Sequence, residues 1–143
     1  PPFVAYVGLP DELRKLAAQA DFVVNTTPLT PETTRLFDAA FFAAMKPRSF
    51  FFNVGRGQSV VQDDLVAALR SGHLAGAGLD VADPEPLPKA SPLWQFPNVI
   101  ITPHVSAASD VGDLARFTIV RENLRRYVAG DRMLSVVDTA KGY

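Results

Sequence analysis

Residues 50–57 read FFFNVGRG, three phenylalanines and Asn-Val followed by a Gly-Arg-Gly turn. A short run of bulky apolar residues that ends on glycines is typical of a buried β-strand and the loop after it. Because glycine lets the backbone approach another group closely, a cation between two glycines would stand in a tight loop directly after the strand. We therefore predict a strand over Phe50–Val54 and a loop over Gly55–Gly57.

The same alternation extends to both sides of this segment. Short apolar runs predict further strands at Phe3–Val7, Phe22–Val24, Ala75–Val81 and Val99–Ile101. Capping residues and helical spacing predict helices between them: Glu12–Ala20 with Asp11 as N-cap, a segment from Thr30 or Pro31 to Met45, and a helix capped by Asp63 or Asp64 that ends at Gly72. Apolar strands separated by helices are typical of a parallel sheet covered on both faces. The predicted fold class is therefore α/β, with a parallel, doubly wound (Rossmann-like) sheet.

The pattern changes in the last third of the chain. Five prolines lie between Asp83 and Pro97, which predicts a segment without regular structure. Further on, apolar residues at helical spacing predict one long amphipathic helix over Gly112–Ala129, which ends at Gly130.

The composition excludes several classes of function. The 143 residues include 14 basic and 15 acidic side chains, for a net charge of −1, so we expect neither nucleic acid nor an anionic membrane as a partner. The sequence has no cysteine, which excludes disulfides and Cys-ligated metals, and we predict no metal site. No apolar stretch approaches the ~20 residues of a membrane span. The composition is consistent with a cytoplasmic protein.

Residues with catalytic chemistry follow successive predicted strands. Arg56 follows the third strand, Asp80 ends the fourth with Glu85 in the loop beyond, and His104 follows the fifth. Ligands bind at the carboxyl ends of the strands in open parallel sheets, so we expect these residues to converge. Each also has a simpler interpretation: a solvated turn arginine, an aspartate that caps a turn, an exposed glutamate and a structural histidine.

Taken together, these residues suit the reduction of a 2-keto acid. An arginine can hold a carboxylate through two parallel hydrogen bonds, and an imidazole can donate a proton to a carbonyl oxygen. A carboxylate next to the imidazole favours its protonated form, which is the role expected of Glu85 beside His104. Asp80 could accept a hydrogen bond from a nicotinamide carboxamide, with the cofactor as the source of hydride.

Four stretches resemble the NAD(P)-dependent D-isomer-specific 2-hydroxyacid dehydrogenases. They are Ala20–Thr34, Met45–Gly57, Leu69–Pro86 and Ser91–His104, in the family's order and spacing. The resemblance implies NAD or NADP as cofactor, a small 2-keto or 2-hydroxy acid as substrate and a homodimer. The sequences of the segments Ser91–Gln95 and Ser135–Tyr143 are most similar to those of the glyoxylate/hydroxypyruvate reductase branch.

The resemblance also assigns roles to single residues. Arg56 would hold the substrate carboxylate, and His104 would be the proton donor, supported by Glu85. The residues in contact with the cofactor would be Thr27, Pro28, Val54, Gly55, Arg56, Asp80, His104, Ser106 and Ala107.

The sequence departs from the family in its length and in one motif. Family members are longer, and the Gly-x-Gly-x-x-Gly turn that binds the pyrophosphate is not in this sequence. We therefore expect a partial sheet that lacks the first βαβ unit. Residues 1–109 would be the C-terminal part of the NAD(P)-binding domain, and residues 110–143 a long helix and tail that return to a substrate domain. Two alternatives remain open: a nucleotide-regulated binding module, as in the C-terminal-binding-protein corepressors, and an inactive fragment.

Overall fold

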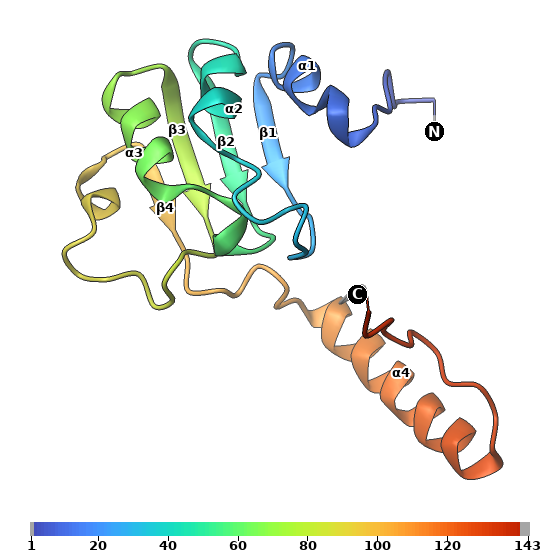
Figure 1. Cartoon of the computed structure of the whole chain (residues 1–143). Helices are drawn as coiled ribbons and strands as arrows, with labels where there is room; N and C mark the ends of the chain where they lie inside the picture. Colours follow the sequence, from blue (N-terminus) through green and yellow to red (C-terminus); the bar gives the residue numbers. More distant parts are fainter. Residues whose placement is uncertain (1, 141–143) are drawn as a thin grey trace. The chain divides into compact units, whose positions relative to one another are not determined.

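The chain forms two compact units, Pro1–Pro103 and His104–Tyr143 (Figure 1). The computed structural model describes residues 2–140, apart from the side chains of residues 110 and 111. The end of the segment 135–143, which contributes to the family resemblance, lies outside the described residues. The first unit contains the sheet, and the second contains a long helix and the tail after it.

The first unit is built on a four-stranded parallel sheet. The strands are β1 (Phe22–Asn25), β2 (Ser49–Asn53), β3 (Leu74–Leu79) and β4 (Val99–Ile101), in the spatial order β1-β2-β3-β4. Val23 pairs with Phe51, and Ala77 pairs with both Phe51 and Val99. Parallel pairing of consecutive strands requires a crossover between each pair, and these crossovers carry the helices. The predicted α/β class with a parallel sheet is confirmed.

Segment Phe3–Val7 is not a strand, contrary to the sequence prediction. Residues 4–9 have no regular secondary structure, and the side chains of Phe3 and Val7 are 85% and 84% exposed. A strand needs a neighbour that satisfies its backbone N–H and C=O groups, and among residues 2–140 no strand pairs with this segment. Apolar, β-branched composition alone therefore does not make a strand here.

The first two helical segments are shorter than the sequence predicts. A 3₁₀ turn, η1 (Pro10–Glu12), leads into α1 (Leu13–Ala17), so Asp11 lies inside the turn and is not an N-cap. The segment predicted to run from residue 30 or 31 to Met45 contains only α2 (Ala39–Ala44) as α-helix. Arg35 has a φ of 56° and Phe37 forms a β-bridge with Val60, and both features keep the chain before Asp38 out of a helix.

The aspartates near the start of α3 (Gln62–Arg70) do not cap it. Its N-cap is Val61, which offers no side-chain acceptor. Asp64 instead accepts a hydrogen bond from the backbone N–H of Ala39 at 2.8 Å, at the start of α2. The carboxylate therefore serves a helix that is distant in the sequence. The predicted end of α3 at Gly72 is confirmed, because this glycine has a φ of 74°.

The proline-rich segment is not wholly irregular. A 3₁₀ turn, η3 (Pro92–Gln95), begins after Ser91, whose hydroxyl accepts a hydrogen bond from the N–H of Leu93. Proline at the first helical position has no N–H to lose, which is why Pro92 is tolerated there.

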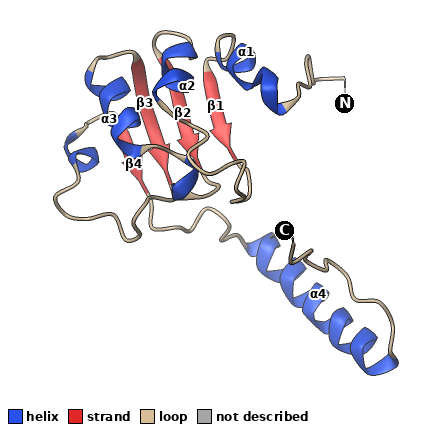
Figure 2. Ribbon diagram, viewed as in Figure 1, coloured by secondary structure: helices blue, strands red, loops and turns tan. Residues whose placement is uncertain are grey.

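The core lies between the sheet and the helices on one of its faces. Figure 2 shows α2 and α3 in front of the strands. Phe51 of β2 is fully buried, and its ring centroid lies 5.2 Å from that of Phe42, 5.3 Å from that of Phe37 and 6.2 Å from that of Phe41. These aromatic contacts attach β2 to α2 and the segment before it.

The opposite face of the sheet carries apolar side chains that remain exposed. Phe22 is 63% exposed, Val24 56% and Ile100 70%. The rings of Phe22 and Phe50 stack at 5.3 Å across β1 and β2. Within the described part of the first unit, helices pack on one face of the sheet, whereas the sequence predicts cover on both.

The second unit consists of α4 (Asp110–Ala129) and the segment that follows it. Ser109 caps the helix by accepting a hydrogen bond from the N–H of Gly112 at 2.9 Å. Gly130 ends it in the left-handed conformation with a φ of 74°, as the sequence predicts. Leu114 and Phe117, on the predicted apolar stripe of this helix, are 71% and 75% exposed.

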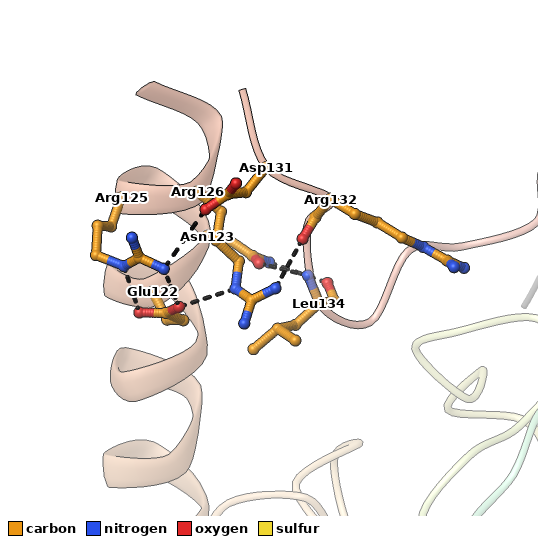
Figure 3. Close-up of polar contacts among 7 residues, drawn as sticks. All are labelled: Glu122, Asn123, Arg125, Arg126, Asp131, Arg132 and Leu134. Carbon is orange, nitrogen blue, oxygen red and sulfur yellow. Dashed lines mark hydrogen bonds and ion pairs between the residues drawn. The ribbon is translucent and has the colours of Figure 1, made fainter. Parts of the chain in front are cut away.

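An ion-pair cluster stabilises the last turns of α4 (Figure 3). Glu122 accepts hydrogen bonds from Arg125 at 2.9 and 3.1 Å and from Arg126 at 2.8 Å. Arg125 also approaches Asp131 at 3.8 Å. The hydrogen bonds from Arg125, followed by those from Arg126, lower the pKa of Glu122 to about 2.

The segment after α4 is hydrogen-bonded to the last turns of this helix (Figure 3). The Asn123 side chain accepts a hydrogen bond from the N–H of Leu134 at 2.7 Å and donates one to its carbonyl at 3.0 Å. Arg126 donates to the carbonyl of Arg132 at 2.9 Å. These contacts fold residues 131–134 back along the helix.

Candidate functional site

Three buried polar side chains join the carboxyl ends of β1 and β2. Asn25, Asn53 and Ser59 are 2%, 1% and 0% exposed. The Nδ2 of Asn25 donates to Oδ1 of Asn53 and to Oγ of Ser59, both at 2.8 Å. Asn25 and Asn53 are partners in the parallel register of the two strands, which places their side chains side by side. We refer to these three residues as the polar network.

The polar network fixes the loop after β1. Oδ1 of Asn25 accepts hydrogen bonds from the N–H of Thr27 at 3.0 Å and from its hydroxyl at 2.7 Å. An asparagine side chain that bonds backbone two residues on forms a turn without a glycine. The next residue, Pro28, offers its carbonyl to the hydroxyl of Thr33 at 2.7 Å. Thr27 and Pro28, two of the predicted cofactor-binding residues, therefore lie in a loop of defined shape.

The polar network also fixes the backbone of Arg56. Nδ2 of Asn53 donates to the carbonyl of Arg56 at 3.0 Å, and the hydroxyl of Ser59 donates to the same oxygen at 2.6 Å. The N–H of Gly55 donates to Oδ1 of Asn53 at 3.1 Å. The Arg56 side chain is exposed, and its Nη1 donates to the carbonyl of Gly55 at 2.7 Å. A fixed backbone thus presents an exposed guanidinium at the edge of the sheet.

Two close backbone approaches explain the glycines around Arg56. A Cβ on Gly55 would lie 2.8 Å from the carbonyl oxygen of Thr27, and a Cβ on Gly57 would lie 1.8 Å from that of Ala82. Both distances are shorter than a side chain tolerates, so only glycine allows the loop after β2 to pack against the loops after β1 and β3. The N–H of Val54 adds a hydrogen bond to the carbonyl of Asn25 at 3.1 Å. The structure therefore brings together Thr27, Val54, Gly55 and Arg56.

Asp80 lies buried at the carboxyl end of β3. It is 5% exposed, and its Oδ1 accepts a hydrogen bond from the hydroxyl of Thr102 at 2.6 Å. Its N–H donates to the carbonyl of Asn53 at 2.9 Å, which ties it to the end of β2. A carboxylate group can accept more than one hydrogen bond, which makes Asp80 chemically suited to bind a polar ligand group.

Glu85 is exposed and belongs to the turn that follows β3. Its Oε1 accepts a hydrogen bond from the N–H of Ala82 at 2.9 Å. Since the backbone of Ala82 also packs against Gly57, the turn that carries Glu85 and the loop that carries Arg56 are neighbours.

His104, Ser106 and Ala107 belong to the second unit. The convergence of His104 with Arg56 and Glu85, and the cofactor contacts of Ser106 and Ala107, therefore stay predictions. His104 has a φ of 55°, in the left-handed region that histidine enters more readily than most residues. Ser106 and Ala107 lie in the exposed stretch between His104 and α4.

Sequence reasoning missed the residues that shape this site. Asn25, Asn53, Ser59 and Thr102 carry no catalytic chemistry of their own, and only their position after or at the end of a strand signals them. Among residues 2–140, no group of three or more His, Asp or Glu side chains could hold a metal ion. In that same part of the chain, no helix is long and apolar enough to cross a bilayer.

A family model for the NAD-binding domain of D-isomer-specific 2-hydroxyacid dehydrogenases matches residues 4–106. The chain belongs to this family. The resemblance derived from the sequence is thereby confirmed, and the four parallel strands form a partial Rossmann-like NAD-binding fragment of such a dehydrogenase.

Solved dehydrogenase structures agree closely with this chain. A D-isomer-specific 2-hydroxyacid dehydrogenase from Xanthobacter autotrophicus, in complex with NADPH, is 42% identical with a TM-score of 0.85, and the match covers 93% of this chain and 54% of the other. An NADPH-dependent glyoxylate/hydroxypyruvate reductase from Sinorhizobium meliloti, in complex with NADP and sulfate, is 41% identical with a TM-score of 0.83, over 93% and 43% of the two chains.

A curated relative points to the same branch of the dehydrogenases. Glyoxylate/hydroxypyruvate reductase A from Photorhabdus laumondii is 38% identical over 133 residues, which are 93% of this chain and 42% of the relative. The chain thus spans less than half the length of this relative.

Proposed function

We propose that the protein that contains this chain reduces a small 2-keto acid of the glyoxylate or hydroxypyruvate type, with NADH or NADPH as the reductant. The observation that carries the proposal is the exposed Arg56 guanidinium on a backbone that Asn53 and Ser59 fix in the loop after β2. The buried Asp80 follows the neighbouring strand β3, and both residues lie at the carboxyl edge of the sheet, where such folds bind ligands. The family membership and the two reductases among the relatives support it.

The residues present fit the nicotinamide end of the cofactor. Gly55 allows the loops after β1 and β2 to approach closely enough to form a shaped edge, and Asp80 offers a buried acceptor for a carboxamide N–H. Thr27, Pro28 and Val54 line the same edge. When bound, the cofactor supplies the hydride that reduces the keto carbon.

The side chains of this chain would perform the remaining steps. Arg56 would hold the substrate carboxylate with two charge-assisted hydrogen bonds and thereby orient the keto group. His104 would donate a proton to the keto oxygen as negative charge develops on it. Glu85 would support His104 in this role, and Ser106 and Ala107 would contact the cofactor.

We also propose how the chain is organised within that protein. Residues 1–109 form the C-terminal part of the NAD(P)-binding domain, and residues 110–143 form the helix and tail that return to a substrate domain. The protein acts as a homodimer, as its family resemblance implies, and it works in the cytoplasm, with which its cysteine-free composition is consistent.

The proposal is tested with the complete native protein and the variant Arg56→Ala. Wild-type protein is expected to oxidise NADPH or NADH in the presence of glyoxylate or hydroxypyruvate. Loss of the charge-assisted bonds, worth ~1.5–3 kcal/mol, raises the KM of Arg56→Ala for the keto acid by about one to two orders of magnitude.

The matched control is the variant Arg70→Ala. Arg70 is an exposed arginine at the end of α3, and this helix leads to the opposite edge of the sheet. The variant is expected to leave the KM for the keto acid unchanged. Nucleotide binding by the wild type without turnover of any 2-keto acid would contradict the proposal and favour the nucleotide-regulated binding module.

A further inference from the structure

Building on the proposed function, we infer that the polar network of Asn25, Asn53 and Ser59 positions Arg56 and couples the substrate-carboxylate subsite to the loop at Thr27. None of the three side chains would touch the substrate, so each is a positioning residue.

The first observation is that Asn25, at the centre of the network, makes every hydrogen bond its side-chain amide can make. Asn25 uses its full amide capacity, with two bonds accepted from Thr27 and two donated to Asn53 and Ser59. Buried polar groups are costly unless they are paired, so an amide with both donors and both acceptors occupied has one orientation. The geometry of the two loops follows from that orientation.

The second observation is that both asparagines need to be amides. An aspartate at position 53 would place an oxygen against the carbonyl of Arg56, and an aspartate at position 25 would place one against Oδ1 of Asn53. Either contact sets two acceptors against each other in a buried site. A residue that only filled space in the core would not need an amide N–H donor at this position.

The third observation is that the bonds end on the Arg56 carbonyl. This oxygen accepts from Nδ2 of Asn53, from the hydroxyl of Ser59 and from the N–H of Ser59 at 3.2 Å. The direction in which residue 56 projects is thus set by two buried side chains. Since an error of ~1 Å in the position of a substrate-holding group can cost ~100-fold in rate, this fixation has a measurable consequence.

The chain offers a matched pair of serines for the test. Ser59 and Ser49 are 0% and 2% exposed, and Ser49 lies at the opposite end of β2. The hydroxyl of Ser49 is buried and makes no hydrogen bond, whereas that of Ser59 makes two in the polar network. Serine-to-alanine changes at both positions therefore remove the same atom from equal burial, but only one of them touches the network.

The experiment measures two quantities in the complete protein. These are the KM and kcat for glyoxylate, and the dissociation constant of oxamate, a non-reducible glyoxylate analogue, by calorimetry with NADPH present. Ser59→Ala is expected to raise KM and the oxamate dissociation constant about tenfold with a smaller change in kcat. Ser49→Ala changes neither.

A double-mutant cycle separates positioning from general destabilisation. If Ser59 acts through the Arg56 side chain, Ser59→Ala has little further effect on oxamate binding in an Arg56→Ala background, which leaves no guanidinium to position. An equal loss in both backgrounds, or an unchanged KM in Ser59→Ala, overturns the inference. Asn53→Asp, which keeps the side-chain shape, is expected to give a larger loss than Ser59→Ala, and wild-type KM in that variant also overturns it.

The proposed function and this inference fail in different ways. If the wild type binds oxamate but reduces no 2-keto acid, the proposed function fails, while the binding cycle still tests the network. If the wild type reduces glyoxylate and the cycle is additive, the function stands and the positioning role is wrong.

Discussion

Single residues in this chain take their roles from neighbours that are distant in the sequence. The Arg56 carbonyl accepts from Asn53 and Ser59, and the backbone around it passes within contact of Ala82 at Gly57. Asp80 is linked to Thr102, which lies 22 residues later. The reactive side chains are thus presented by backbone that other buried side chains fix.

His104 carries the prediction that belongs to this scale. Because its φ is 55°, the variant His104→Asn is preferable to alanine, since asparagine tolerates the left-handed region. In the complete protein we expect kcat for the keto acid to fall by ~10²–10⁴, the contribution of a general acid, with nearly unchanged NADPH affinity.

The control for this prediction is His73→Asn. The His73 ring makes a hydrogen bond with the Met45 carbonyl at 2.9 Å, which is a structural contact. This variant is expected to lower the thermal midpoint and leave kcat unchanged. Unchanged turnover in His104→Asn would remove the proton-donor role from His104.

At the scale of elements, the helix ends follow local capping rules only in part. Asp38 follows the rule for an N-cap residue, because its Oδ1 accepts a hydrogen bond from the N–H of Phe41 in α2 at 2.8 Å. Asp64, in contrast, bonds the start of α2 instead of its own helix. The C-terminal end of α4 combines a glycine stop with the Glu122 ion pairs and the Asn123 contacts to Leu134.

The Glu122 cluster predicts an acid-sensitive end of α4. The pKa of Glu122 is lowered from 4.5 to about 2, so its ion pairs contribute stability above pH ~4.5 that is lost as the pH falls through about 2. The amide resonance of Leu134, followed by NMR, should move with a midpoint near that lower value. In Glu122→Gln the contact between Asn123 and the Leu134 amide should be weakened at every pH. A midpoint near 4.5 in the wild type would contradict the lowered pKa of Glu122.

For the first unit as a whole, one core joins the sheet to the helices of a single face. Phe51 lies at its centre, with no exposed surface and three phenylalanine neighbours from the α2 region. The opposite face carries Phe22 and Ile100, which remain exposed.

Two phenylalanines of the sheet therefore differ in their expected contribution to stability. Phe51→Ala should destabilise the protein by about 3–5 kcal/mol, because it removes buried contacts and leaves a cavity. Phe22→Ala, at a side chain that is 63% exposed, should cost far less. Denaturant unfolding of both variants, followed with a probe in the first unit, checks the ranking, and equal losses would show that the uncovered face is buried in the complete protein.

The sequence by itself determined the order of strands from Phe22 to Ile101, the parallel α/β class, the end of α4 at Gly130 and the family. These features depend on local apolar periodicity, on glycines with positive φ and on motifs of contiguous residues. Tertiary structure decided that Phe3–Val7 is not a strand, that Asp64 serves α2, and that Asn25, Asn53 and Ser59 form one network. Each of these depends on a partner 25 or more residues away, or on the lack of one, and such pairings are set by strand register and helix packing, which no local pattern encodes.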